Sequence, residues 1–440
     1  MKIQLSEHFT YKKLLRFVLP SIIIFTSIYG VVDGLFVSNY VGKTAFAGLN
    51  LIMPFIMALS ALGFMMGTGG SAIVAKTLGE GKKKKANEYF SLLVYVTLVG
   101  GIIFSVLGIA LTKYVSAALG ATGELLDNCI LYGRIIFLSM PAFMLQNVFQ
   151  CFFVTAERPK LGLTVIVLAG VTNMILDFLF IAVFSWGLAG AAFATVCGEC
   201  VGGLLPLVYF GRENASPFRL GKTKLYWNIL GKTCTNGSSE LMTNLSSSIV
   251  NTLFNFQLMH FAGEDGVAAY GTLMYVNFIF VAIFLGYSIG SAPIVSYHYG
   301  ARNSEELKNL LTKSLKMIGV WGVALFALAQ MIASPLARIF VGYDPDLFDL
   351  TRHGFRIFCL AFLINGFNIY GSSFFTALNN GLLSALISFL RTLVFQIASV
   401  LLLPMIFGID GIWGAVFVAE ILTLYVTIIC LAKKQKVYHY

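Results

Sequence analysis

The sequence predicts an all-α polytopic membrane protein with twelve transmembrane helices, arranged as two parallel repeats of six helices each. Composition gives the first indication, because 58% of the 440 residues are hydrophobic and 11% are charged, whereas about a quarter of the residues of a soluble domain are charged. Apolar runs of about 20 residues or more recur along the chain, and such runs cross about 30 Å of hydrocarbon as helices. The runs are continuous rather than alternating, which favours helices over a closed barrel.

An internal repeat with an offset of 221 positions is the second indication. The pairs of identical residues at this offset are Gly42 and Gly263, Gly79 and Gly300, Gly133 and Gly354, Thr155 and Thr376, Gly187 and Gly408, Gly190 and Gly411, and Glu199 and Glu420. An offset that holds from one end of the chain to the other indicates two halves with the same number of elements of the same length. In so apolar a chain, such a repeat indicates a transporter built from two related halves. We therefore expect two six-helix lobes, residues 1–220 and 221–440, with the substrate path between them.

Twelve predicted spans fit this division. The first half holds spans at residues 14–39, 46–77, 88–111, 125–152, 161–184 and 188–210, and the second half holds spans at residues 229–259, 267–298, 309–332, 347–375, 382–406 and 411–432. An even number of spans per half means that both halves cross the membrane in the same direction. The repeats are therefore expected to be parallel and related by an axis along the membrane normal.

Basic residues indicate the orientation of the spans. They concentrate in one set of connecting segments, such as residues 82–85 and 212–224, whereas the opposite set holds little beyond Lys43, Lys113 and Arg338. The positive-inside rule then places both termini in the cytoplasm, with the chain in the inner (cytoplasmic) membrane of the cell. The same rule accounts for the net charge of +10, so the lipid bilayer is an expected partner and nucleic acid is not.

An ion gradient is the expected source of energy. Gly-Lys-Thr occurs at Gly42, Gly221 and Gly231, but the glycine that a Walker A sequence requires five positions earlier is absent each time.

Cys197 and Cys200 form a Cys-x-x-Cys pair inside a predicted span, and we expect them to be structural. The sequence therefore predicts no enzyme, no organic cofactor and no resident metal, with H⁺ or Na⁺ as the coupling ion.

Acidic residues inside the spans carry the main functional signal, because a carboxylate in hydrocarbon is costly. Asp33 lies about 20 residues into its span and Asp177 about 16 residues into its own, so at a rise of 1.5 Å per residue both are expected in the outer half of the membrane. Thr195 lies a turn or two into a span that starts outside. Asn173 precedes Asp177 by four positions and shares its helix face. These four residues are expected to form one polar cluster in the first lobe.

The repeat offset confines this cluster to the first half of the chain. The counterparts of Asp33, Asn173, Asp177 and Thr195 are Phe254, Val394, Ala398 and Val416. A group needed for the fold would recur in both halves, so we interpret the four residues as a site for a coupling proton or cation, with Na⁺ at Asp33 and Asp177 as the alternative occupant. Structural hydrogen bonding is the alternative interpretation of the cluster. Glu199 and Glu420 do recur at the offset, and we expect both to make structural polar contacts.

A substrate cavity is expected beside the polar stretch that contains Glu240 and Asn244. So polar a transmembrane helix cannot face lipid all round and should line a wet cavity. Met53, Gln146 and Gln150 are assigned to the same cavity, since soft Met side chains adapt to varied ligands. Ordinary packing, and for Glu240 a solvated position near the cytoplasmic end, are the alternatives.

Several short motifs, in order and at matching spacing, resemble the multidrug and toxic compound extrusion (MATE) family over nearly the whole chain. They are Val-Asp-Gly-Leu-Phe-Val-Ser at residues 32–38, Gly-Glu-Gly-Lys at 79–82 with Gly-Ala-Arg at 300–302, Asn-Met-Ile-Leu-Asp at 173–177, and Gly-Leu-Ala-Gly-Ala-Ala-Phe-Ala-Thr at 187–195 with Gly-Ile-Asp-Gly-Ile-Trp at 408–413. One departure is that the tenth span has no acid after Asp349, so the resemblance does not extend to a second-lobe sodium site.

The resemblance implies a V-shaped pair of six-helix bundles that exports amphipathic, mostly cationic drugs or toxins by proton or sodium antiport and alternating access. It also implies a monomer, with the cation site of the first lobe on Asp33, Asn173, Asp177 and Thr195. A lipid-linked precursor flippase of the same superfamily is the alternative function, and a membrane-embedded enzyme or channel is a third. A flippase would need a strongly basic central cavity, and the intramembrane bases are Arg134, Arg356 and Arg391.

Overall fold

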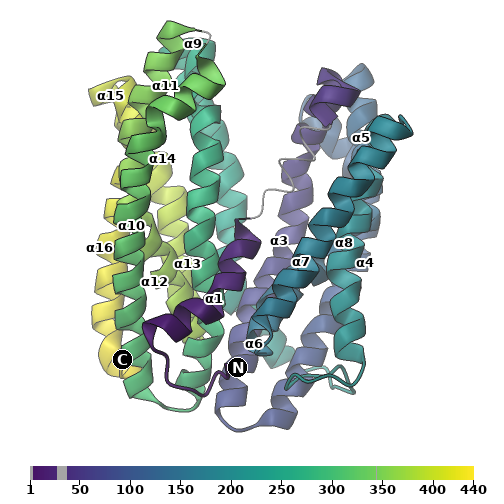
Figure 1. Ribbon diagram of the computed structural model, residues 1–440, viewed down its shortest axis with the longest axis vertical. Coiled ribbons are helices and arrows are strands. Elements are labelled where there is room, and N and C mark those ends of the chain that lie inside the picture. Colours follow the sequence, from purple (N-terminus) through teal and green to yellow (C-terminus); the bar gives the residue numbers. More distant parts are fainter. Residues whose placement is uncertain (1–2, 27–36, 343) are drawn as a thin grey trace. The chain divides into compact units, whose positions relative to one another are not determined.

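The computed structural model describes residues 3–26, 37–342 and 344–440. Every regular element in these ranges is a helix (Figure 1), which confirms the predicted all-α fold class. The first repeat holds α1 (Tyr11–Phe25), η1 (Val37–Val41), α3 (Lys43–Gly79), α4 (Lys83–Ala118), α5 (Gly123–Leu138), α6 (Met140–Thr155), α7 (Pro159–Asp177), η2 (Phe178–Val183) and α8 (Gly187–Gly211). The second holds α9 (Trp227–Gly300), α10 (Ser304–Val341), α11 (Pro345–Phe358), η3 (Cys359–Leu363), α12 (Asn365–Ala377), α13 (Gly381–Phe389), η4 (Leu390–Phe395), α14 (Gln396–Leu402), α15 (Pro404–Phe407) and α16 (Ile409–Tyr438).

Within the described ranges, nine helices are long and apolar enough to cross a membrane, or ten if α5 and α6, which meet at a bend of 57°, form one span. α9 alone covers two predicted spans, 229–259 and 267–298. Its 74 residues would extend over about 110 Å as one straight helix, several times the thickness of the hydrocarbon. The backbone leaves helical geometry at Gly263, with φ 60° and ψ −148°, which divides α9 between those spans. The predicted span 14–39 lies partly outside the described residues, so the total of twelve stays a prediction.

The internal repeat is visible in the backbone as well as in the sequence. Positive φ angles occur in pairs at the offset of 221: 116° at Gly42 and 60° at Gly263, and 58° at Gly187 and 56° at Gly408. Left-handed conformations of this kind are open to glycine at little cost, which explains why glycine stands at both members of each pair. The two repeats therefore turn at equivalent points.

The described residues divide into two compact units: unit 1 holds residues 3–5 and 37–237, and unit 2 holds residues 6–26 and 238–440. The compact units do not follow the repeats throughout, since α1 packs in unit 2 and the start of α9 packs in unit 1. The predicted division of the repeats at residue 220 stays a prediction. The segment before α9 is bonded to α4, where Arg219 N donates to Asn87 Oδ1 at 2.8 Å and Tyr226 Oη donates to Glu88 Oε2 at 2.7 Å. These bonds hold the start of α9 in unit 1.

Glycines allow close packing of the two helices that lie in the unit of the other repeat, which are α1 and the start of α9. In unit 1, a Cβ atom at Gly237 of α9 would lie 2.0 Å from the carbonyl oxygen of Met65, and one at Gly69 would lie 2.2 Å from the carbonyl oxygen of Thr233. Such distances are too short for any side chain, so α3 and α9 touch through their backbones.

A similarly close contact occurs in unit 2, at the repeat-related positions of the second helix. Gly286 and Gly290 are the counterparts of Met65 and Gly69, and Cβ atoms there would lie 2.6 Å from Ile22 Cα and 3.0 Å from Ser21 Cβ of α1. In each unit, the second helix of one repeat therefore packs against the first helix of the other repeat, and it uses the same two positions of the second helix in both units. The contacted positions of the first helix are not equivalent.

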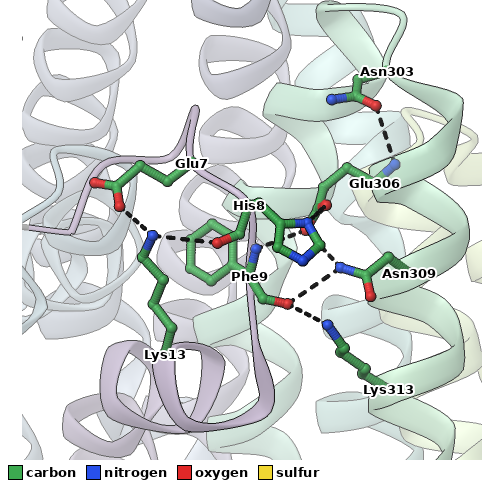
Figure 2. Close-up of polar contacts among 8 residues, drawn as sticks. All are labelled: Glu7, His8, Phe9, Lys13, Asn303, Glu306, Asn309 and Lys313. Carbon is green, nitrogen blue, oxygen red and sulfur yellow. Dashed lines mark hydrogen bonds and ion pairs between the residues drawn. The ribbon is translucent and has the colours of Figure 1, made fainter.

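A polar cluster anchors the segment before α1 to the start of α10 (Figure 2). Asn303 caps α10 by accepting from Glu306 N at 3.1 Å. The carboxylate of Glu306 accepts from Phe9 N at 2.9 Å and from Asn309 Nδ2 at 2.8 Å, and it lies 2.5 Å from His8 Nδ1. The Phe9 carbonyl in turn accepts from Lys313 Nζ at 2.6 Å. An acid in the first turn of a helix is favourable, and here its charge also holds the N-terminal segment in unit 2.

The anchor can be tested with Glu306→Gln. Glu306 is 4% exposed, so replacing one acceptor oxygen by a donor leaves the Phe9 amide or His8 without its bond, at a cost of about 1–3 kcal/mol. We expect the amide of Phe9 to exchange roughly tenfold faster or more in hydrogen-exchange mass spectrometry of residues 6–13. Glu305→Gln changes an exposed neighbour and should leave the rate unchanged. Equal protection of Phe9 in both variants would contradict this role of Glu306.

Candidate cation-coupling site

Three of the four predicted coupling residues lie in the described part of unit 1. Asp33 lies outside the described residues. α7 carries Asn173 and Asp177 one helical turn apart, and they are 3% and 0% exposed. Asp177 is the last residue of α7 before the π-helical turn η2. π-Helical turns inside α-helices are rare and frequently mark functional sites.

The structure brings Asn173 and Thr195 together. Asn173 Nδ2 donates to Thr195 Oγ1 at 3.5 Å, which is longer than an ordinary N–H···O bond, and Thr195 Oγ1 donates to the carbonyl of Ala191 at 3.1 Å. Among the described residues, no donor reaches the buried Asn173 Oδ1. A buried amide oxygen without a donor is unfavourable, so this atom is suited to a ligand that supplies positive charge.

Glycine sets the distance between the two helices at this point. A Cβ atom at Gly198 would lie 3.0 Å from the carbonyl oxygen of Ala169 and 3.0 Å from Asn173 Cβ. α8 can therefore approach α7 closely enough for Thr195 to meet Asn173.

The five predicted cavity residues are distributed over both units. In unit 1, Gln146 is buried at 3% exposure, and its Oε1 lies 2.1 Å from where a Cβ atom would stand at Gly202. Met53 packs at the edge of the hydrophobic core of the same unit, and Gln150 is half-buried. In unit 2, Glu240 is half-buried and Asn244 is exposed, with Asn244 Nδ2 donating to the carbonyl of Glu240 at 2.8 Å. Their assignment to one substrate cavity stays a prediction.

An exposed polar stripe extends along α9 from Asn244. The exposed residues at helical spacing are Asn244, Ser247, Ser248, Asn251 and Asn255. Such a stripe inside a membrane-spanning segment favours contact with water over contact with lipid.

The recurring glutamates have polar partners on neighbouring helices. Glu199 of α8 accepts from Ser139 Oγ. Glu420 of α16 accepts from Arg391 Nε at 2.8 Å and from Asn368 Nδ2 at 2.7 Å. Both glutamates thus have partners within their own unit, and the structural role expected for them stays a prediction. The sequence did not predict Arg391 and Asn368 as partners of Glu420. For Asn368 a signal existed, because it is identical to Asn147 at the repeat offset.

These features are those of a polytopic membrane protein with an internal repeat and a polar site in one repeat. The sequence model of the MatE family matches residues 20–179 and 241–402. The two matched segments start 221 positions apart and together cover more than half of the chain. The chain therefore belongs to the MatE family, and as a member of it is a multi-pass membrane transporter and not an enzyme.

Relatives and solved structures are similar over nearly their full length. The multidrug export protein MepA of Staphylococcus haemolyticus strain JCSC1435 is 23% identical over 418 residues, which are 94% of this chain and 92% of that protein. A crystal structure of MATE in complex with MaL6 has a TM-score of 0.93 at 21% identity, covering 99% of this chain and 98% of the other. A multidrug resistance MATE family transporter of the MOP superfamily, solved in an outward-facing conformation, has a TM-score of 0.92 at the same identity and coverage.

Gly198→Ala tests whether the distance between α7 and α8 matters. Its Cβ atom would press on Ala169 and Asn173, and overpacking of this kind costs about 1–3 kcal/mol. We expect a lower Tm, because the added methyl group pushes α8 away from α7 and separates Thr195 from Asn173. Gly100→Ala is the matched control, since the nearest atom to its Cβ, on Phe104, lies 4.0 Å away. The role of Gly198 is rejected if the two variants have the same Tm.

Proposed function

We propose that this chain is a cation-coupled antiporter that exports amphipathic, mostly cationic drugs or toxins by alternating access. The observation that carries the proposal is the confinement of one buried polar site to one repeat. In unit 1, Asp177 and Asn173 are buried and Thr195 is half-buried, and their counterparts Ala398, Val394 and Val416 are apolar. Relatives named multidrug export protein support export of drugs as the activity.

The proposed coupling ion is a proton rather than Na⁺. Two carboxylates, Asp33 and Asp177, are expected at one depth, and two like charges close together in a low dielectric are unfavourable. A single shared proton removes that repulsion. Asn173 and Thr195 would hold the pair in place through their amide and hydroxyl groups.

In the proposed cycle, an external proton reaches Asp33 in the outward-open state and neutralises it. Charged and neutral forms of Asp33 favour different surroundings in a low dielectric, which biases the first helix between two arrangements. The cationic drug leaves as the proton enters. Direct competition between drug and proton for one carboxylate is the alternative cycle.

The proposed substrate path uses the polar stripe of α9, with Glu240 and Asn244 at its start. Met53, Gln146 and Gln150 are proposed to complete the path from the first repeat. A carboxylate beside neutral amides and hydroxyls would attract a cation without holding it by many fixed bonds. We further propose that the chain acts as a monomer in the inner membrane, with both termini in the cytoplasm.

A lipid-linked precursor flippase is the alternative function. Recognition of a pyrophosphate head group would require free basic side chains in the cavity. Of the three intramembrane arginines, Arg391 is already bonded to Glu420, which leaves Arg134 and Arg356, both exposed, for such a contact. The relatives named multidrug export protein make the drug exporter the better-supported proposal.

The function is tested by counter-flux in proteoliposomes, with a pH gradient and a Na⁺ gradient imposed separately and ethidium as the amphipathic cation. We expect ethidium movement to follow the pH gradient, because a proton neutralises the carboxylates. Movement driven by the Na⁺ gradient alone would replace the proton by Na⁺ as the coupling ion. No cation movement under either gradient would overturn the proposed function.

The same assay tests the residues. Asp33→Asn and Asp177→Asn keep side-chain size and remove the exchangeable charge, so each should reduce coupled flux to background while the purified protein keeps its fold. Asp349→Asn is the matched control, because Asp349 is an exposed acid paired with Arg352, and its flux should equal that of the unmodified protein. Full flux with Asp33→Asn would remove Asp33 from the proposed site.

A further inference from the structure

We propose that Arg391 is a tethered cation that fills a cation site formed by Glu420 and Asn368 in unit 2, and that it keeps mobile cations out of that site. This inference concerns a part of the molecule that the proposed coupling site does not use. It does not depend on which ion drives transport or on which compound is exported.

The site is assembled from three helical elements of unit 2. The Glu420 carboxylate on α16 accepts a hydrogen bond from Arg391 Nε of η4 at 2.8 Å. It accepts a second one from Asn368 Nδ2 of α12 at 2.7 Å. Asn368 Nδ2 also donates to the Glu420 carbonyl at 2.8 Å, and Asn368 Oδ1 accepts from Thr427 Oγ1 at 3.0 Å. Both carboxylate oxygens and both ends of the amide are therefore bonded, and the amide cannot turn without losing bonds at both ends.

The pair is enclosed within the unit. The side chain of Glu420 is 1% exposed and that of Arg391 is 13% exposed. Glu420 is the twelfth of the thirty residues of α16 and the tenth of the 22 residues of the predicted span 411–432, and therefore lies near the middle of that span. A carboxylate at that depth needs a positive partner, and removal of one member of a buried pair is strongly destabilising. Because arginine does not lose its proton in proteins, the partner is permanent rather than exchangeable.

The first repeat has the same carboxylate and amide without the arginine. At the offset of 221, Glu420 corresponds to Glu199 and Asn368 to Asn147, but Arg391 corresponds to Gly170. Gly170 lies in regular α7, whereas Arg391 lies in the π-helical turn η4, so the arginine is an addition in the second repeat.

The consequence is a division of roles between the repeats. A site filled by a tethered guanidinium binds neither Na⁺ nor a cationic group of a substrate. Exchange of cations at the membrane interior is then left to the polar site of unit 1. Arg391 is in this sense a specificity-determining residue, because it decides where in the chain a mobile cation can bind.

The test is Arg391→Gly, which places in the second repeat the residue that stands at position 170 in the first. Loss of the guanidinium leaves Glu420 without a cation, and we expect Tm to fall by roughly 5–10 °C. Millimolar methylguanidinium, which matches the missing group, should restore most of that loss, since a ligand that binds only the folded state raises Tm. Methylurea, its neutral analogue, should restore none, and the unmodified protein should respond to neither.

Two controls identify the site. In the double variant Arg391→Gly with Glu420→Gln no charge remains buried, so Tm should recover without the probe and should not respond to it. Arg356→Gly removes an exposed arginine and should show no response to methylguanidinium. If Arg391→Gly does not accumulate, the yield of monodisperse protein with and without methylguanidinium gives the same comparison. No recovery of Arg391→Gly by methylguanidinium, or equal recovery in the double variant, would overturn the proposal.

Discussion

A polar group enclosed among membrane-spanning helices has to find its partner inside the protein, and this constraint governs the structure. There is no water in hydrocarbon to bond it, so each buried carboxylate is either compensated by a neighbour or available to an ion. Glu420 is compensated by Arg391 and Asn368. Asn173, by contrast, keeps an amide oxygen that no described donor reaches. The two repeats satisfy the same constraint in different ways.

The repeat itself is a property of the backbone. Gly42 and Gly263 have positive φ angles, as do Gly187 and Gly408, so both halves turn at equivalent positions. Close helix contacts also recur at equivalent positions of the second helix of each repeat, although the residues differ: Met65 takes the place that Gly286 has in the other half. Backbone geometry is thus shared between the repeats, while the buried polar side chains are free to diverge.

The fold class was predictable from sequence because apolar run length and the repeat offset are one-dimensional signals. The end of an apolar run is also a one-dimensional signal, so the predicted gap between residues 259 and 267 contains the backbone break at Gly263. The packing of α1 in unit 2 was not predictable, because an offset aligns positions along the chain without saying which helices touch. Nor was the Arg391–Glu420 pair, since Arg391 lies in the π-helical turn η4, where the 3.6-residue period that relates position to helix face no longer holds. Asp177 and Asn173 lie in regular helix, and their shared face followed from spacing alone.

A symmetric scaffold with asymmetric charge has a mechanical consequence for a transporter. Binding energy shifts a conformational equilibrium only as far as it differs between the two conformations. If both repeats held an exchangeable cation, the energy of ion binding would be divided between two sites that need not fill together. On our proposals the second repeat carries its cation permanently, and occupancy of the first repeat alone decides the balance between conformations. One ion-binding event in unit 1 is then sufficient to drive the change of access, and the fixed Arg391–Glu420 pair gives unit 2 the same charge in every step of the cycle.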